Sequence, residues 1–202
     1  MTTSNLHSDE IHCIVLAAGS SQRFDGDKTE ICLHGKPMSI NIALILQAIT
    51  PNVLLIINQN NKNLQQAADK QGINCIINKQ NCGIGSSISQ AITASLQAKG
   101  WLICLGDMPF IQPDTYQRIY AALLQGDTHS IVLPRYNTKA GHPAGFSSVW
   151  KTQLQNLTGD SGARAIINKN TQHIRYIEVD DSGIHIDIDT QDDLKNSFIS
   201  SV

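Results

Sequence analysis

The amino-acid sequence predicts a three-layer α/β fold built on a mostly parallel sheet. Short apolar runs, each long enough for a buried strand, recur at residues 11–18, 53–57, 74–77 and 101–105. Stretches with helical spacing of apolar residues separate them, and strands that alternate with helices form βαβ units. The 202 residues suffice for one well-buried domain, which we expect over residues 11–202, after a loosely ordered polar tail at 1–10.

Proline and glycine mark the boundaries of the expected helices. The predicted helices cover residues 38–49, 60–71, 83–99, a stretch that starts at Pro113, and 162–168. Gly100 is expected to cap the third of them. A fifth strand is expected at 130–133, and two edge strands at 174–179 and 183–188, paired through a turn at Asp180 and Asp181.

The composition excludes several classes of protein. Charged residues make up 16% of the chain and the formal net charge is −2, so nothing indicates nucleic acid or an anionic membrane as a partner. The five cysteines have no C-x-x-C spacing, and Cys13, Cys75 and Cys104 lie in apolar runs, which indicates reduced core thiols. No apolar run approaches membrane-spanning length, and residues 1–10 lack the core of a signal peptide. We therefore expect a cytoplasmic protein.

The stretch I-V-L-A-A-G-S-S-Q-R-F-D-G-D-K, residues 14–28, follows the first strand and carries two cations. Small residues at a strand end let backbone N–H groups approach a ligand, and Arg23 and Lys28 would neutralise its charge. The pattern therefore predicts a cradle for a polyphosphate. The alternative is a glycine that serves turn geometry alone, because the loop contains neither G-K-[ST] nor G-x-G-x-x-G.

Asp107 is the strongest single candidate in the chain. It stands in the sequence L-G-D-M-P at the end of the strand expected at 101–105, where a carboxylate is well placed to hold Mg²⁺ on triphosphate oxygens. The alternative is a turn or helix-capping aspartate, but Pro113 and Asp114 already supply the start of the next helix. Asp187 or Asp189 would add a second carboxylate, and we favour Asp187. Asp189 or Thr190 can instead be the N-cap of a helix that starts at Gln191.

Several other loops carry candidates with ordinary alternatives. The glycine-rich start of the helix at residue 83 can present N–H groups to an anion, or serve as a serine-capped helix start. Asn78 is a candidate for base contact, or a turn asparagine. His142, between Gly141 and Pro143, is by itself more typical of a hydrogen-bonding turn residue than of a catalyst. Arg164 is a candidate phosphate contact, or a solvated helix residue.

These motifs together resemble the MobA-like nucleotidyltransferases, and within them most the molybdenum cofactor cytidylyltransferases. The resemblance extends over residues 11–194 and rests on L-A-A-G-S-S-Q-R-F followed by Lys28, and on G-I-G-S-S, L-G-D-M-P, G-H-P-A-G-F, L-T-G-D-S-G-A-R and D-I-D-T-Q-D-D-L, in family order. Asp25 stands where the family usually has glycine, and Gln191 replaces the common proline. The resemblance implies a Rossmann-like sheet of the nucleotide-diphospho-sugar transferase type.

The resemblance also implies a reaction and a set of roles. CMP would pass from CTP to the terminal phosphate of Mo-molybdopterin, pyrophosphate would leave, and molybdopterin cytosine dinucleotide would form for a molybdoenzyme. Arg23, Lys28 and Asp107 would be catalytic, and Mg²⁺ or Mn²⁺ would bind Asp107, Asp187 or Asp189. The implied nucleotide contacts are Leu16, Ala17, Ala18, Gly19, Ser20, Ser21, Arg23, Lys28, Asn78, Gly83, Gly85, Ser86 and Ser87. The implied acceptor contacts are Gly141, His142, Pro143, Gly145, Asp160, Gly162 and Arg164.

Ala18 favours CTP, because the guanylyl branch of the family carries L-A-G-G where this chain has L-A-A-G. Other functions stay open at this point. They are a GTP-using enzyme, a transferase with a sugar phosphate acceptor, and a cofactor-binding chaperone without turnover. An NAD(P)-linked oxidoreductase is disfavoured by the missing G-x-G-x-x-G.

Overall fold

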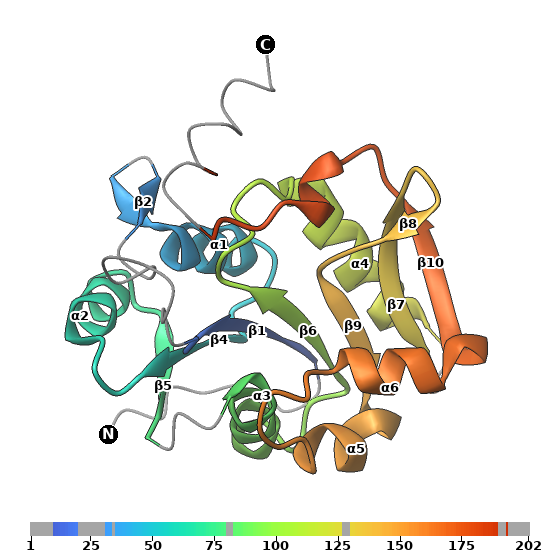
Figure 1. Ribbon diagram of the computed structural model, residues 1–202, viewed down its shortest axis with the longest axis horizontal. Helices are drawn as coiled ribbons and strands as arrows, with labels where there is room; N and C mark the ends of the chain where they lie inside the picture. Colours follow the sequence, from blue (N-terminus) through green and yellow to red (C-terminus); the bar gives the residue numbers. More distant parts are fainter. Residues whose placement is uncertain are drawn as a thin grey trace.

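The computed structural model describes residues 10–19, 31–33, 35–79, 83–126, 130–189 and 193. Within these ranges the main sheet has eight strands in the order β10-β7-β9-β6-β1-β4-β5, with β8 paired to β7 (Figure 1). The strands are β1 (Ile11–Ala17), β4 (Val53–Asn58), β5 (Asn74–Asn78), β6 (Gly100–Leu105), β7 (Ile131–Tyr136), β8 (Lys139–Ala140), β9 (Ala144–Ser147) and β10 (Ile174–Glu178). A separate small sheet pairs β2 (Cys32–Leu33) with β3 (Lys36–Pro37).

Helices cover both faces of the main sheet, which confirms the three-layer prediction (Figure 1). They are α1 (Met38–Gln47), α2 (Lys62–Lys70), α3 (Gly83–Ala94), α4 (Pro113–Gln125), α5 (Lys151–Gln155) and α6 (Arg164–Lys169). Helices α1, α2 and α4 pack on one face, and α3, α5 and α6 on the other. Three short 3₁₀ helices complete the described part of the chain: η2 (Ser148–Trp150), η3 (Thr171–His173) and η4 (Ser182–His185).

Strand β1 lies at the centre and is buried along its whole length. Its alternate side chains enter different cores: Cys13 and Val15 face the α1 and α4 layer, and Ile14 and Leu16 face the α3 layer. A strand buried on both faces needs an unbroken apolar run, which is why this stretch was readable from the sequence. β1 is parallel to both β4 and β6, so the carboxyl ends of these strands meet at one edge of the sheet.

Strand β9 is antiparallel to its neighbours β6 and β7. Its sequence, Ala-Gly-Phe-Ser, is too short to be recognised as an apolar run, and the sequence analysis did not predict it. The remaining pairs along the sheet order are parallel, so the prediction of a mostly parallel sheet holds.

The prediction of paired edge strands at 174–179 and 183–188 is wrong in its second half. β10 pairs with β7, in parallel, and not with residues 183–188. Residues Ser182–His185 form the 3₁₀ helix η4, because the Gly183 amide donates to the Asp181 carboxylate and the Ile186 amide donates to the Gly183 carbonyl. These turn hydrogen bonds occupy the backbone groups that a strand would need.

Gly100 is the first residue of β6 and not the cap of α3, which corrects a second prediction. Helix α3 ends at Ala94, and Ser95 beyond it donates from its hydroxyl to the Ala91 carbonyl and accepts from the Trp101 indole. A Cβ atom at residue 100 would lie 2.6 Å from the Phe146 carbonyl oxygen, so glycine is required by the close approach of β9.

Burial raises the pKa of the Cys13 and Cys104 thiols far above the ordinary range, and raises that of Cys75 to about 12, with a further contribution from the nearby Asp69 carboxylate. Each of these thiols is free, as the sequence predicted.

Among the residues that the structure describes, no helix is both long and apolar enough to cross a membrane.

Candidate functional site

The candidate site is organised around the adjacent ends of β1 and β6. The register pairs Leu16 with Leu105, and the Gly106 amide donates a 2.9 Å hydrogen bond to the Leu16 carbonyl. A Cβ atom at residue 106 would lie 2.8 Å from that carbonyl oxygen, so only glycine allows the two strands to end so close together. Asp107 therefore follows directly at this edge of the sheet, where β1 ends at Ala17 and Ala18 follows it, both of them buried.

The segment after β10 crosses the same edge. Its Ile188 amide donates to the Asp107 carbonyl at 2.8 Å, and its Ile184 carbonyl accepts from the His142 amide at 3.1 Å. Gly141 packs directly on Ile184, where a side chain would collide with its carbonyl oxygen. These contacts bring together three predicted site segments that are distant in the sequence: the Asp107 loop, the His142 loop and the Asp187 segment.

Charged groups converge on the imidazole of His142. Burial has the largest effect and lowers the His142 pKa. The Asp107 carboxylate raises the pKa, the Arg164 guanidinium lowers it further, and the Asp187 carboxylate raises it. The lowered pKa keeps His142 neutral at pH 7, as a hydrogen-bonding and positioning residue requires. Its Nδ1 atom is buried and has no hydrogen-bond partner among the described residues.

Asp107 and Asp187 were predicted from the sequence to share a divalent cation, and the structure brings their segments together. Both act on the same imidazole, and Asp187 directly precedes the residue that hydrogen bonds to Asp107. In the described part of the chain no group of three or more His, Cys, Asp or Glu residues could hold a metal by itself. A pair of carboxylates nonetheless fits Mg²⁺, which takes one or two carboxylates and completes its shell with phosphate oxygens and water.

Asp189 is exposed, and its backbone amide donates to the Asp193 carboxylate at 3.1 Å. Its carboxylate is not among the groups that shift the pKa of His142, whereas that of Asp187 is. Asp187 is thus the one of the two whose charge acts on His142, and its preference over Asp189 as the partner of Asp107 stays a prediction.

The start of α3 packs backbone to backbone against the loop that carries Asp160. The Gly85 amide donates to the Gly159 carbonyl at 2.9 Å, and a Cβ atom at residue 85 would lie 2.7 Å from the Ser161 carbonyl oxygen. Gly83 has a φ of +83° and a side chain there would also collide with this loop. The two glycines thus join a predicted nucleotide segment to a predicted acceptor segment.

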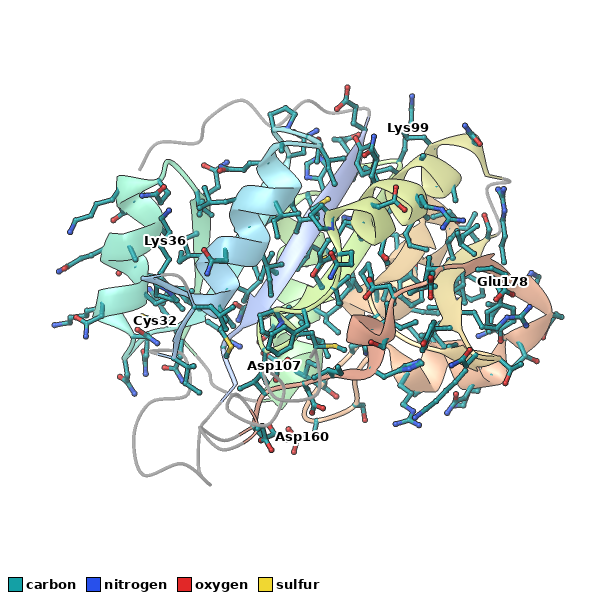
Figure 2. The ribbon with its side chains drawn as sticks, turned by 90° about the horizontal axis from the view of Figure 1, so that it is seen from above. Cys32, Lys36, Lys99, Asp107, Asp160 and Glu178 are labelled. Atoms are coloured by element: carbon teal, nitrogen blue, oxygen red, sulfur yellow. The ribbon has the colours of Figure 1, made fainter. Side chains whose placement is uncertain are left out.

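Asp107 and Asp160 lie at the same end of the molecule, and Lys99 lies at the opposite end (Figure 2).

Asn78 and Ser87 are buried and hydrogen bonded to each other. The side-chain Nδ2 of Asn78 donates to the Ser87 hydroxyl at 2.9 Å, and its Oδ1 accepts from the Gln90 side chain at 3.2 Å. These contacts fix α3 to the end of β5, so both residues act on the site by holding the helix in place. Ser86, next to them, is partly exposed.

The remaining predicted acceptor residues have different surroundings. Pro143 is buried and follows a cis peptide bond. Gly145 lies inside β9, where a side chain would collide with Leu123, so its role is in packing. Gly162 is partly exposed and lies beside the side chain of Ile84, and Arg164 begins α6 with its side chain exposed.

Gly19 ends the described part of the first loop, and no described atom lies within 4 Å of the place that a Cβ atom would occupy. Ser20, Ser21, Arg23 and Lys28 lie outside the described residues, as does Asp25. The phosphate cradle therefore stays a prediction from the sequence.

The sequence analysis missed Asp181, which it assigned to a turn. This aspartate is 6% exposed and accepts hydrogen bonds from Gln112, Thr115 and Gly183. The pair Asp180-Asp181 before a Ser-Gly dipeptide is a capping signal that could have indicated a local turn. Nothing in the sequence could have revealed the contacts to Gln112 and Thr115.

Comparison with known proteins gives one family match and a set of related structures. A family model described as a MobA-like NTP transferase domain matches residues 13–174. The Bifunctional protein GlmU of Xylella fastidiosa (strain M12) is 28% identical over 173 residues, which is 80% of this chain and 36% of that protein. The chain thus spans about a third of the length of the curated relatives it matches.

Solved structures of other proteins share the fold. Rv0371c from Mycobacterium tuberculosis H37Rv superposes with a TM-score of 0.82 at 24% identity, over 96% of this chain and 100% of that one. A second crystal structure of Rv0371c, in complex with manganese, has a TM-score of 0.79. The CMP:2-keto-3-deoxy-manno-octonic acid synthetase complexed with CTP has a TM-score of 0.74 at 13% identity, over 95% of this chain and 99% of that one.

Proposed function

Because this chain belongs to the family of MobA-like NTP transferase domains, we propose that it transfers CMP from CTP to the terminal phosphate of a molybdopterin-type acceptor. In this reaction an oxygen of the acceptor phosphate attacks the α-phosphorus of CTP. The bond from that phosphorus to the bridging oxygen of the β-phosphate breaks, and pyrophosphate leaves. The product is molybdopterin cytosine dinucleotide, which a molybdoenzyme would receive.

The meeting of the Asp107 loop, the His142 loop and the Asp187 segment at one edge of the sheet is the observation that supports the proposal. Two backbone hydrogen bonds join them, from the Ile188 amide to the Asp107 carbonyl and from the His142 amide to the Ile184 carbonyl. Two carboxylates from segments that meet at one sheet edge match a reaction between two phosphate groups, which needs positioning and charge neutralisation more than proton abstraction. A divalent cation held by Asp107 and Asp187 would supply charge neutralisation on the triphosphate. The manganese complex of Rv0371c supports a divalent cation in a protein of this fold.

Other residues of the chain would bind the triphosphate and the acceptor. Arg23 and Lys28 would neutralise charge on the triphosphate, and the small residues Ala17, Ala18 and Gly19 would let the backbone approach it. Arg164 would hold the acceptor phosphate. The neutral imidazole of His142, with its buried Nδ1 facing no described partner, would orient the acceptor by a hydrogen bond.

CTP is the preferred nucleotide in this proposal. It rests on Ala18, which matches the cytidylyl branch of the family, and a structural neighbour solved with CTP supports it. The same neighbour, by its name a synthetase that joins CMP to a sugar acid, favours a second candidate: transfer of a nucleotidyl group to a sugar-type acceptor.

The test is to incubate the purified protein with each of CTP, GTP, UTP and ATP, Mg²⁺ or Mn²⁺, and each acceptor class, and to measure pyrophosphate. Release with CTP and molybdopterin is the expected result. Release with CTP and a sugar acid or sugar phosphate alone would establish the second candidate. Saturable CTP binding with no pyrophosphate under any acceptor would contradict both and favour a cofactor-binding protein without turnover.

A further inference from the structure

Asp181 is a buried carboxylate that lies outside every motif identified in the sequence. It is 6% exposed, and its Oδ2 accepts from the Gln112 amide at 2.8 Å and from the Thr115 hydroxyl at 2.6 Å. Its Oδ1 accepts from the Gly183 amide at 2.9 Å. A buried charge is costly unless hydrogen bonds satisfy it, so these donors hold the carboxylate in one place.

The partners of Asp181 come from two different parts of the fold. Gln112 is the N-cap residue of α4 and Thr115 lies in its first turn, so two bonds join Asp181 to the helix that follows the Asp107 loop. A carboxylate at the start of a helix is also stabilised by the helix dipole. The bond to Gly183 fixes the first turn of η4, the beginning of the segment that leads to Asp187.

The segment that starts at Asp181 is attached at several further points. Gly183 packs on the Phe110 carbonyl so closely that a side chain would collide with it. The Ile184 carbonyl accepts from the His142 amide, and the Ile188 amide donates to the Asp107 carbonyl. Asp187 is exposed and lies between the last two of these attachments, so its position depends on how the whole segment is held.

We propose that Asp181 is a positioning residue that holds the 181–188 segment against α4 and thereby keeps Asp187 beside Asp107 for a divalent cation. This inference rests on the proposed function, because it assumes that Asp107 and Asp187 share the metal. Asp181 itself touches neither substrate nor metal. Its effect on metal binding is transmitted through the backbone of η4 and residues 186–188.

Asp181→Asn is the informative substitution because it keeps the shape of the side chain. The asparagine side chain keeps one acceptor oxygen and has an N–H₂ group in place of the other. This N–H₂ group would face the backbone N–H of Gly183 or of Gln112, so two donors would oppose each other and one hydrogen bond would be lost. Asp180→Asn is the matched control: Asp180 is the exposed neighbour, and the substitution removes the same charge. Loss of outer hydrogen bonds that orient metal ligands typically weakens metal binding by about 10- to 100-fold.

The experiment measures Mn²⁺ binding by electron paramagnetic resonance, with CTP present, in wild-type protein and both variants. Hydrogen exchange of the peptide that contains residues 182–188 is followed in parallel by mass spectrometry. We expect Asp181→Asn to weaken Mn²⁺ binding about tenfold or more and to speed exchange in this peptide, while Asp180→Asn leaves both unchanged. Where turnover is measurable, excess Mn²⁺ should restore the kcat of Asp181→Asn.

Equal Mn²⁺ affinity in wild type and Asp181→Asn would overturn the role of Asp181 and leave the proposed function standing. Absence of saturable Mn²⁺ binding by the wild-type protein would instead contradict the proposed function itself. If Asp181→Asn does not fold, Thr115→Val removes one of the bonds to Oδ2 and should shift both readouts in the same direction by a smaller amount. Unchanged affinity and exchange in Thr115→Val would then overturn the inference.

Discussion

The backbone amide of Ile188 donates a 2.8 Å hydrogen bond to the carbonyl oxygen of Asp107. This single contact joins the end of β6 to a segment near the end of the described chain, and it sets Asp187 next to the aspartate at the strand tip. The backbones of Asp107 and Asp187 are therefore neighbours, although the two residues come from motifs far apart in the sequence.

Asp107→Asn is expected to lower the rate of CTP-dependent pyrophosphate release by about 100-fold or more, because loss of an electrostatic group at the reacting phosphates has effects of this size. The amide keeps the size of the side chain, so the fold should be retained. Asp114→Asn is the control: Asp114 is exposed on α4 and its ion pair with Arg118 is long, at 4.0 Å. Wild-type rates in Asp107→Asn would place the reaction elsewhere in the molecule.

Asp187→Asn and Asp189→Asn separate the two possible partners of Asp107. Since the charge of Asp187 and not that of Asp189 acts on His142, we expect Asp187→Asn to raise the half-saturating Mn²⁺ concentration about tenfold or more, at least the effect of losing a group that only supports a metal site. Asp189→Asn should stay within about twofold of wild type, as exposed side chains usually do. The reverse ranking in a Mn²⁺ titration of turnover would assign the site to Asp189.

Gly85→Ala is expected to destabilise the protein by about 1–3 kcal/mol, the usual cost of overpacking. The added methyl group would lie 2.7 Å from the Ser161 carbonyl oxygen, so α3 and the 158–161 loop would have to separate. Thermal unfolding gives the measurement. Gly162→Ala serves as the comparison for stability, since its methyl group would meet Ile84 at an ordinary 3.4 Å. Equal unfolding temperatures for the two variants would contradict this packing.

Because of its buried thiols, the protein is expected to lose free energy of unfolding at alkaline pH. Burial raises the pKa of Cys13 and Cys104 in the folded state, so the neutral thiol is favoured there and the unfolded chain ionises first. The stabilisation is complete below the unfolded-state pKa, near 9, and is lost as the pH rises above it, by about 1.4 kcal/mol per pH unit for each thiol.

Urea unfolding between pH 7.5 and 10 measures this dependence. The Cys13→Ala, Cys104→Ala double variant should show a shallower decline in unfolding free energy than wild type, although its stability at neutral pH is lower. Identical pH slopes in the two proteins would show that these thiols do not titrate differently on unfolding.

Much of the fold could be predicted from the sequence because its central elements depend on local patterns in the chain. Strands β1, β4 and β6 are buried on both faces and must be unbroken apolar runs, and Pro113 marks the start of α4 without help from distant residues. The errors arose where distant contacts decide the local structure. The sequence suggests a helix cap at Gly100, but the close approach of Phe146 explains the glycine. The sequence also suggests a strand over 183–188, but Ser182–His185 form a 3₁₀ helix whose first turn is fixed by the hydrogen bond from the Gly183 amide to Asp181.

The sequence by itself determined the layers of the fold, the family and the types of chemical group at the strand ends, because apolar periodicity and short motifs are local properties of the chain. Only the tertiary structure decided that the segment of Asp187 lies against Asp107, that Asn78 holds α3 through Ser87, and that Asp181 is buried and bonded to Gln112. Each of these depends on hydrogen bonds between residues that the chain separates and the sheet edge brings together, and no local pattern encodes such pairings.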